Sequence, residues 1–433
     1  MRTVLTMVML VLASAALAEP PVRDDEPGWW DALLYVDSMY AQNPTHMNFS
    51  YWIPPEGDPR PAYIRNGSEF LEADARWDGE RLVMDFPHYD SRLEAKRIMN
   101  VGGRLAIQGK WTKQRSDEVA EMDVWAIEAG DYFWQHTEAG DEGWEIKPQP
   151  ARTERWVMEF SKSGTAFGVF KYTGRSEQYE DPSKPDRQEL HGTIMTPTGD
   201  YRFLSGEFGT SSDGDTYKLS VFDGAHAFVF EAEKNRRDRT LRGDFYSGTH
   251  WHETFTARRL GYDEEFSFPD PFSEVTLQPG QTRLGLPRLN EAPYAGKPTI
   301  VQIFGTWCPN CHDEAPVLVD LYERYHGKGL QILSLAYEYT DDRERSERQI
   351  AHFKERHGAT WEFVAAGIND KQKTAASLPA LSAVKSYPTT IWINPDGTVR
   401  AIHSGFSGPA TGEEHEKTKA EFETLTKEIV EAQ

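Results

Sequence analysis

Apolar and β-branched residues gather in short runs in the last third of the chain, and amphipathic stretches separate these runs. Residues 299–306 (TIVQIFGT) and 330–340 (LQILSLAYEYT) are typical of buried strands. Between them, apolar side chains recur at helical spacing after Cys308, and Gly327 ends the pattern. Further along, the pattern predicts a helix over 341–358, a strand over 361–367, a short helical segment over 373–386 and a closing helix over 412–433. An α/β domain is therefore expected here.

Residues 19–265 show a different pattern, in which short aromatic and β-branched runs are broken by Gly, Asp and Asn. Examples are 80–86, 104–111, 123–130, 156–174 and 226–245, with hairpin-turn candidates at 101–103 and 235–239. This pattern predicts a large all-β domain, built as a meander, a sandwich or a barrel. Two stretches, IQGKW (107–111) and LRGDF (241–245), precede similar strands and indicate a loose repeat. The Pro-rich residues 266–272 mark a linker, so the α/β domain spans 273–433.

The first eighteen residues have the layout of a secretory signal peptide. Arg2 precedes an apolar run over 4–12, and Ala16-Leu17-Ala18 provides the small residues of a cleavage site. A membrane anchor would need a longer run to cross a hydrocarbon core of ~30 Å, and no other stretch approaches ~20 consecutive apolar residues. We expect cleavage after Ala18, export to a bacterial periplasm and no stable membrane insertion.

Composition narrows the choice of partners. Hydrophobic residues make up 38% of the chain, which is enough to build cores, and the formal net charge is −22. Such an acidic surface repels nucleic acid and anionic lipid, so we expect no nucleic-acid partner.

The chain has only two cysteines, Cys308 and Cys311. A disulfide between them would close a loop of four residues, which has little stabilising value. A zinc site needs at least three protein ligands, and the pair with His312 falls short unless distant histidines join. Redox chemistry of a dithiol is the remaining interpretation, with no cofactor. Cys308 is expected at a helix N-terminus, where the helix dipole favours a thiolate, and Cys311 one turn further in.

These residues resemble a known family. Residues 307–316 (WCPNCHDEAP) are similar to the active site of the TlpA/ResA-like thiol–disulfide oxidoreductases, with a thioredoxin fold. Residues 386–409 (SYPTTIWINPDGTVRAIHSGFSGP) resemble the family's cis-proline loop and the β-hairpin that follows. Pro388 would be the cis-proline, and the GFSGP loop would close the substrate groove. The resemblance implies a thioredoxin fold in the order β-α-β-α-β-α-β-β-α.

The resemblance also implies a mechanism and partners. Cys308 would attack a disulfide in a client protein, and Cys311 would resolve the mixed disulfide. Trp307, Tyr387, Pro388 and Thr389 would contact the client. The resemblance favours a reductase that a membrane thiol relay keeps reduced.

One position departs from the thioredoxin pattern. A buried aspartate often lies six residues before the first cysteine, but this chain has Gln302 there. Glu338 is then the candidate general base for Cys311, with a solvated strand-end carboxylate as the alternative. Glu314 is expected to complement the helix dipole, and His312 to lie along the helix surface.

Other functions remain open at this point. The domain could act as a disulfide oxidase or isomerase, as a peroxiredoxin-like peroxidase, or as a vestigial module in a non-enzymatic binding protein. Thr306-x-Cys308 misses the Pro-x-x-x-Thr-x-x-Cys spacing of a peroxidase. His250 and His252 would share one face of a strand, as a metal pair or as ordinary surface residues. For the β-rich region we expect client docking, positioning of the redox module or self-association.

Overall fold

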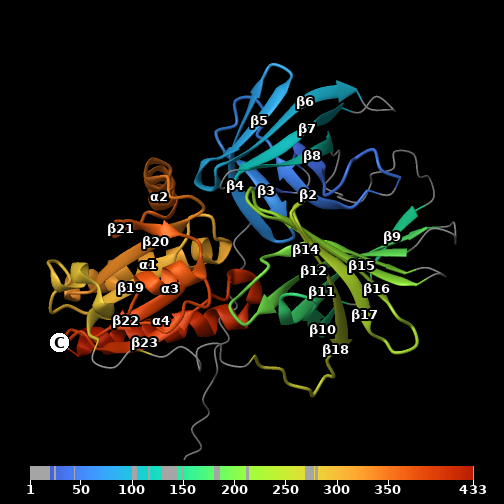
Figure 1. Ribbon diagram of the computed structural model, residues 1–433. Helices are drawn as coiled ribbons and strands as arrows, with labels where there is room; N and C mark the ends of the chain where they lie inside the picture. Colours follow the sequence, from blue (N-terminus) through green and yellow to red (C-terminus); the bar gives the residue numbers. More distant parts are fainter. Residues whose placement is uncertain are drawn as a thin grey trace, which may run out of the picture.

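The computed structural model of the protein describes residues 20–23, 26–42, 44–99, 105–115, 118–128, 144–148, 151–179, 186–210, 214–268, 277 and 281–432. The predicted signal peptide (1–18), the turn candidate at 101–103 and residues 269–272 of the predicted linker lie outside the described residues. Within them the strands form two antiparallel barrels and one mixed sheet flanked by helices (Figure 1). The prediction of an α/β domain after an all-β region is confirmed.

The first barrel closes because β1 pairs with both β2 and β8. Its strands are β1 (Trp29–Tyr35), β2 (His46–Trp52), β3 (Ala62–Asn66), β4 (Glu69–Asp78), β5 (Arg81–Phe86), β6 (Ser91–Met99), β7 (Leu105–Gln114) and β8 (Val119–Glu128), with the 3₁₀ turn η1 (Pro87–Tyr89) after β5. Side chains alternate across each strand, so that Leu82, Met84 and Phe86 of β5 all enter the core.

The second sheet also closes, since β11 pairs with β12 as well as with β10. Its strands are β9 (Trp144–Pro148), β10 (Arg152–Phe160), β11 (Gly164–Tyr179), β12 (Asp186–Thr196), β13 (Gly199–Asp200), β14 (Leu204–Thr210), β15 (Asp215–Phe222), β16 (Ala227–Lys234), β17 (Leu241–Ser247) and β18 (Trp251–Arg259). β10 to β12 and β14 to β18 form the ring, and β9 and β13 extend it at the rims. The predicted β-meander is therefore a pair of barrels.

The weak repeat seen in the sequence falls on the seventh strand of each ring, β7 and β17. A Cβ on Gly109 of β7 would lie 1.9 Å from the carbonyl oxygen of Glu94, and one on Gly243 of β17 would lie 2.2 Å from that of Glu231. Both glycines are needed because the neighbouring strand approaches too closely for a side chain. The two barrels thus share strand order and this close contact.

The barrels are joined by the turn between β15 and β16. Phe222, Ala225 and Ala227 from this turn belong to the core of the first barrel. The Trp111 indole N–H donates to the carbonyl oxygen of Gly224 at 3.1 Å, and the Lys113 ammonium donates to that of Ala225 at 3.0 Å. A shared apolar core and buried hydrogen bonds make the two barrels one packed unit.

The C-terminal domain has the element order predicted from the sequence. Its elements are β19 (Thr299–Phe304), α1 (Pro309–Tyr325), β20 (Gln331–Glu338), α2 (Arg343–His357), β21 (Glu362–Ile368), α3 (Lys371–Ser377), β22 (Thr389–Ile393), β23 (Val399–Ser404) and α4 (Glu413–Glu431), with 3₁₀ turns η2 (Arg283–Gly285), η3 (Pro287–Asn290), η4 (His326–Lys328) and η5 (Pro409–Thr411). The sheet order is β21-β20-β19-β22-β23, in which β19 to β21 are parallel and β22 and β23 antiparallel.

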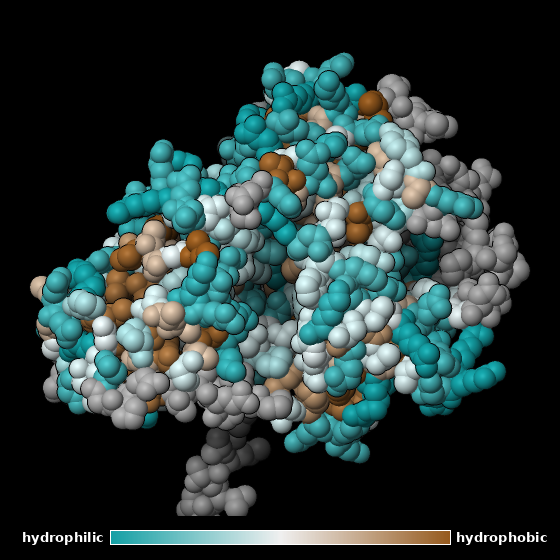
Figure 2. Space-filling model, in the orientation of Figure 1, coloured by the Kyte–Doolittle hydropathy of each residue, from teal (hydrophilic) through white to brown (hydrophobic). Residues whose placement is uncertain are grey.

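The visible surface is mostly hydrophilic, and apolar residues show in small groups over the C-terminal domain (Figure 2). Among the described residues, none of the helices combines the length and the apolar character that crossing a membrane requires.

Candidate redox site

The two cysteines lie where β19 leads into α1. Cys308 is the residue before the helix, and Cys311 lies in its first turn. Both thiols are free; Cys308 is 4% exposed and Cys311 is fully buried. Burial, assisted by the hydrogen bond with Cys308, raises the pKa of the Cys311 thiol well above its ordinary value. Cys311 therefore needs a base before it can act as a nucleophile.

The loop before β22 faces Cys308. The Tyr387–Pro388 peptide bond is cis, and the Cys308 thiol donates to the carbonyl oxygen of Tyr387 at 3.5 Å. The Thr389 hydroxyl points into the domain, where it donates to the carbonyl oxygen of Ser386 and to the Ser404 hydroxyl. Of the three residues predicted in this loop, Tyr387 and Pro388 border the thiol, and the Thr389 side chain does not.

Trp307 forms the other side of the thiol surroundings. Its indole N–H donates to the carbonyl oxygen of Tyr337 at 2.9 Å. Its ring stacks on Tyr339 with centroids 5.3 Å apart and meets the edge of Tyr387 at 5.6 Å. Trp307 and Tyr387 thus form a packed aromatic wall beside Cys308.

Thr306, two residues before Cys308, is held by two buried side chains. Its backbone N–H and its hydroxyl both donate to the Glu338 carboxylate, at 2.9 and 2.8 Å. Nε2 of His312 lies 2.8 Å from the Thr306 carbonyl oxygen, and Nδ1 lies 2.7 Å from Nε2 of His357. The carbonyl can only accept, so Nε2 of His312 donates and Nδ1 accepts. Glu338 and His312 thus fix the turn that presents the dithiol.

This arrangement corrects the expectation for His312. Instead of lying along the helix surface, it is buried, and burial lowers its pKa well below the usual value. A neutral imidazole gives no cation to stabilise a thiolate, so His312 acts through its hydrogen bonds.

Glu314 is also placed differently from the expectation. It is fully buried beneath α1, where the Gln302 amide donates to it at 2.6 Å and the Thr390 hydroxyl at 2.5 Å. Burial raises the pKa of Glu314 to about 7. It lies one helical turn after Cys311 on the same face of the helix. A buried carboxyl with this pKa suits proton transfer near neutral pH.

A hairpin of the second barrel covers the redox face. The backbone N–H of Phe406, in the GFSGP loop, donates to the carbonyl oxygen of Thr198 at 3.3 Å. The backbone N–H of Gly408 donates to the Asp200 carboxylate at 2.7 Å. Gly199 packs on Asn310, between the two cysteines, because a Cβ there would lie 1.8 Å from the Asn310 amide nitrogen. The β12–β13 hairpin therefore occupies the loop predicted to close the substrate groove.

A buried arginine joins all three parts of the molecule. Arg202 of the second barrel lies 2.6 Å from Glu69 of the first barrel, 3.3 Å from Asp313 of α1 and 3.8 Å from Asp223 of its own barrel. Burial raises the pKa of Asp313 to about 6, although Arg202 opposes this effect. Asp313 follows Cys311 by two residues, so the junction lies next to the dithiol.

The first barrel contacts the other side of α1. The His312 ring lies 4.7 Å from Tyr89 and 5.6 Å from His88, both in η1. Arg345 at the start of α2 pairs with Asp90 at 2.9 Å. Both barrels therefore dock on the domain that carries the cysteines.

His250 and His252 do not form the pair that the sequence suggested. His250 lies in a turn and bonds with Arg115 at 2.9 Å, and His252 bonds with Asp244 at 2.7 Å. Among the described residues, no group of three His, Cys, Asp or Glu side chains could hold a metal ion.

Comparison with known proteins follows the same division of the chain. Residues 270–402 match the AhpC/TSA family. These residues form a thioredoxin-like domain. Thioredoxin-like protein YneN of Bacillus subtilis is 28% identical to it over 160 residues, 37% of this chain and 82% of YneN. The thiol–disulfide oxidoreductase ResA of Halalkalibacterium halodurans is 29% identical over 112 residues, 25% of this chain and 55% of ResA. A thioredoxin-family thiol:disulfide interchange protein from Chlorobium tepidum overlaps 31% of this chain and 81% of its own, with 19% identity and a TM-score of 0.24.

The chain thus spans about half the length of this ResA relative. The predicted thioredoxin fold and the class of thiol–disulfide oxidoreductase are confirmed for the thioredoxin-like domain. Sequence reasoning missed the role of Glu314, although a signal was present. Cys311, Glu314, Leu318 and Leu321 follow helical spacing, so Glu314 lies on the apolar, buried face.

Proposed function

We propose that the protein is an exported reductase of protein disulfides that acts through Cys308 and Cys311. The observation that carries the proposal is the free dithiol at the N-terminus of α1, with Cys308 against the cis Tyr387–Pro388 bond. The signal-peptide pattern of residues 1–18 supports export to a periplasm. A membrane thiol relay would return the two electrons that each turnover consumes.

The chemistry balances through two exchanges. The Cys308 thiolate attacks one client sulfur, forms a mixed disulfide and expels the second client sulfur as a thiolate. The Cys311 thiol then loses its proton and attacks Cys308, which releases the first client sulfur. Two electrons pass to the client, and the enzyme retains a Cys308–Cys311 disulfide.

Glu314 is the base that we propose for Cys311. Its pKa of about 7 allows it to accept a proton near neutral pH, whereas the two Glu338 oxygens are engaged by Thr306. Glu338 is accordingly a positioning residue, in place of the base that the sequence favoured.

A client protein needs access that the docked barrels restrict. Cys308 is 4% exposed, and the β12–β13 hairpin lies on the GFSGP loop. We therefore propose that the redox domain shifts away from the barrels when a client binds, and that the barrels exclude unsuitable partners.

A Cys311→Ser variant tests the function. Without the resolving thiol, Cys308 should accumulate mixed disulfides with client proteins, which mass spectrometry of the adducts identifies. The control is the Cys308→Ser/Cys311→Ser variant, in which adducts should vanish. Absence of adducts from Cys311→Ser, or their persistence in the control, would contradict the proposal. Equilibration with glutathione then distinguishes a reductase from an oxidase, because a reductase must have the lower potential.

A further inference from the structure

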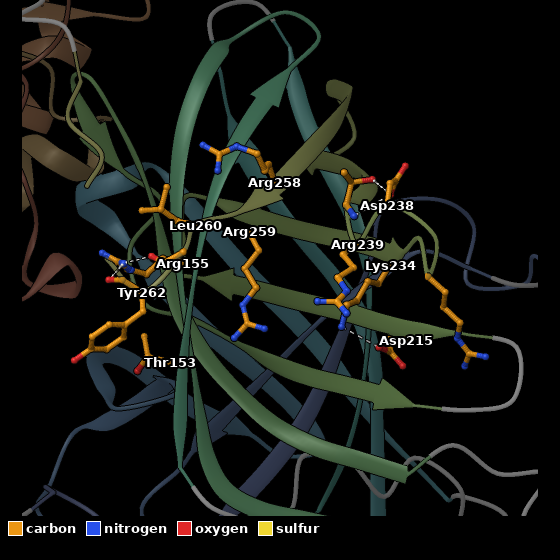
Figure 3. A pocket seen from close by; sticks show the side chains of 13 residues that line it. Thr153, Arg155, Asp215, Lys234, Asp238, Arg239, Arg258, Arg259, Leu260 and Tyr262 are labelled. Atoms are coloured by element: carbon orange, nitrogen blue, oxygen red, sulfur yellow. Dashed lines mark hydrogen bonds and ion pairs between the residues drawn. The ribbon is translucent and has the colours of Figure 1, made fainter. Parts of the chain in front are cut away.

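The second barrel has a cavity at one end that the redox chemistry does not use. It has a volume of about 1130 Å³. Its lining comes from the start of β10, the start of β15, the end of β16, the turn before β17 and the end of β18 with the residues after it (Figure 3). Distant parts of the sequence therefore build one rim.

The lining is strongly cationic although the chain is acidic. Six cations line it against two carboxylates, Asp215 and Asp238, in a chain of formal charge −22. The cations are Arg155, Lys234, Arg236, Arg239, Arg258 and Arg259. A local excess of positive charge inside an acidic protein attracts anions to this one place.

The cations are held ready rather than neutralised. Lys234 lies 3.2 Å from Asp215, and Arg259 lies 3.4 Å from Glu154. The Arg239 guanidinium has no hydrogen-bond or ion-pair partner among the described residues, and in Figure 3 Arg239 and Arg259 reach toward the same space. Exposed ion pairs of this kind contribute little, so an incoming anion can replace them.

The cavity lies away from the dithiol. β15 starts at Asp215 in the cavity and ends at Phe222 in the core of the first barrel. β16 returns from Ala227 to Lys234. The cavity and the docking turn are therefore at opposite ends of the same strands, and a ligand here leaves Cys308 untouched.

We propose that this end of the second barrel binds a small ligand with several phosphate groups. Guanidinium groups bind phosphate oxygens through paired, charge-assisted hydrogen bonds, and several of them line one cavity. The acidic surface around the rim repels a long polyanion, which selects a ligand short enough to fit inside. The phosphates could belong to a free metabolite or to a lipid headgroup.

Calorimetric titration of the full chain with sodium tripolyphosphate tests the site. Binding should weaken by at least about tenfold in Arg239→Gln/Arg259→Gln, since two charge-assisted contacts are lost. Arg239→Glu should weaken it as well, and this variant keeps every ion pair of the fold. The matched control is Arg76→Gln/Arg92→Gln, which removes the same charge from an exposed site on the first barrel and should leave binding unchanged.

Co-sedimentation with vesicles that contain phosphatidate distinguishes the source of the phosphate. Vesicle binding that Arg239→Gln/Arg259→Gln abolishes would assign a lipid headgroup. Tripolyphosphate binding without vesicle binding would assign a free metabolite. The proposal is overturned if neither probe binds, or if both double variants bind as the wild type does.

Discussion

The thioredoxin-like domain and the barrels supply different parts of the redox site. In the domain, Thr306, Cys308, Cys311 and Glu314 come from a single strand–helix junction. In the barrels, the groups that cover the dithiol come from turns distant in the sequence, such as η1 and the β12–β13 hairpin. Residues close in sequence therefore provide the chemistry, and residues far apart provide control of access. Each prediction below separates these two contributions.

The largest effect should come from Cys308→Ser, because the attacking sulfur has no substitute in the chain. Reduction of a small protein disulfide such as insulin should fall by at least about a thousandfold, to the background rate. Circular dichroism should show unchanged β-structure. The control His252→Ala alters only an exposed site on the second barrel, and it should keep full activity. Activity in Cys308→Ser would show that the chemistry lies outside the dithiol.

The same division explains what the sequence could predict. Strand and helix order in the thioredoxin-like domain follows from apolar periodicity, and the Trp307–Cys311 motif locates the dithiol. The aromatic alternation of the β-rich region predicts strands, but ring closure depends on pairing of β1 with β8 and of β11 with β12, across long sequence distances. For the same reason, Arg202 gave no sequence signal, because its partners come from three separate parts of the chain.

Glu314→Gln should next change how stability depends on pH. The folded pKa of Glu314 is about 7, above the model value of 4.5, so the folded state holds the proton more tightly. Its contribution is complete below pH ~4.5 and is lost as pH rises through ~7, by roughly 3 kcal/mol. In urea unfolding across this range, Glu314→Gln should lose less stability than the wild type. Glu347→Gln, at an exposed site of α2, should follow the wild-type profile, and an equal slope in all three proteins would refute the assignment.

A comparison of the two buried acids sharpens the assignment of the base. Glu314→Gln should slow the resolution of a mixed disulfide by about a hundredfold, because proton transfer from Cys311 loses its acceptor. Glu338→Gln should slow it by less than about tenfold, since it disturbs only the Thr306 turn. Single-turnover quenching of a preformed mixed disulfide measures both rates. The reverse order would restore Glu338 as the base.

The smallest effect tests whether the barrels control access. Asp313→Asn/Arg345→Gln removes the ion pairs to Arg202 and Asp90 from the redox side and leaves the partners of the barrels in place. A loss of ~1.4 kcal/mol of docking energy corresponds to about a tenfold rise in the undocked population. Alkylation of Cys308 by a bulky maleimide should accelerate by that factor. Asp320→Asn/Arg343→Gln removes equal charges from ion pairs within the domain and should change nothing. If both variants react alike, then docking does not limit access, and a client must reach Cys308 by a route that the β12–β13 hairpin leaves open.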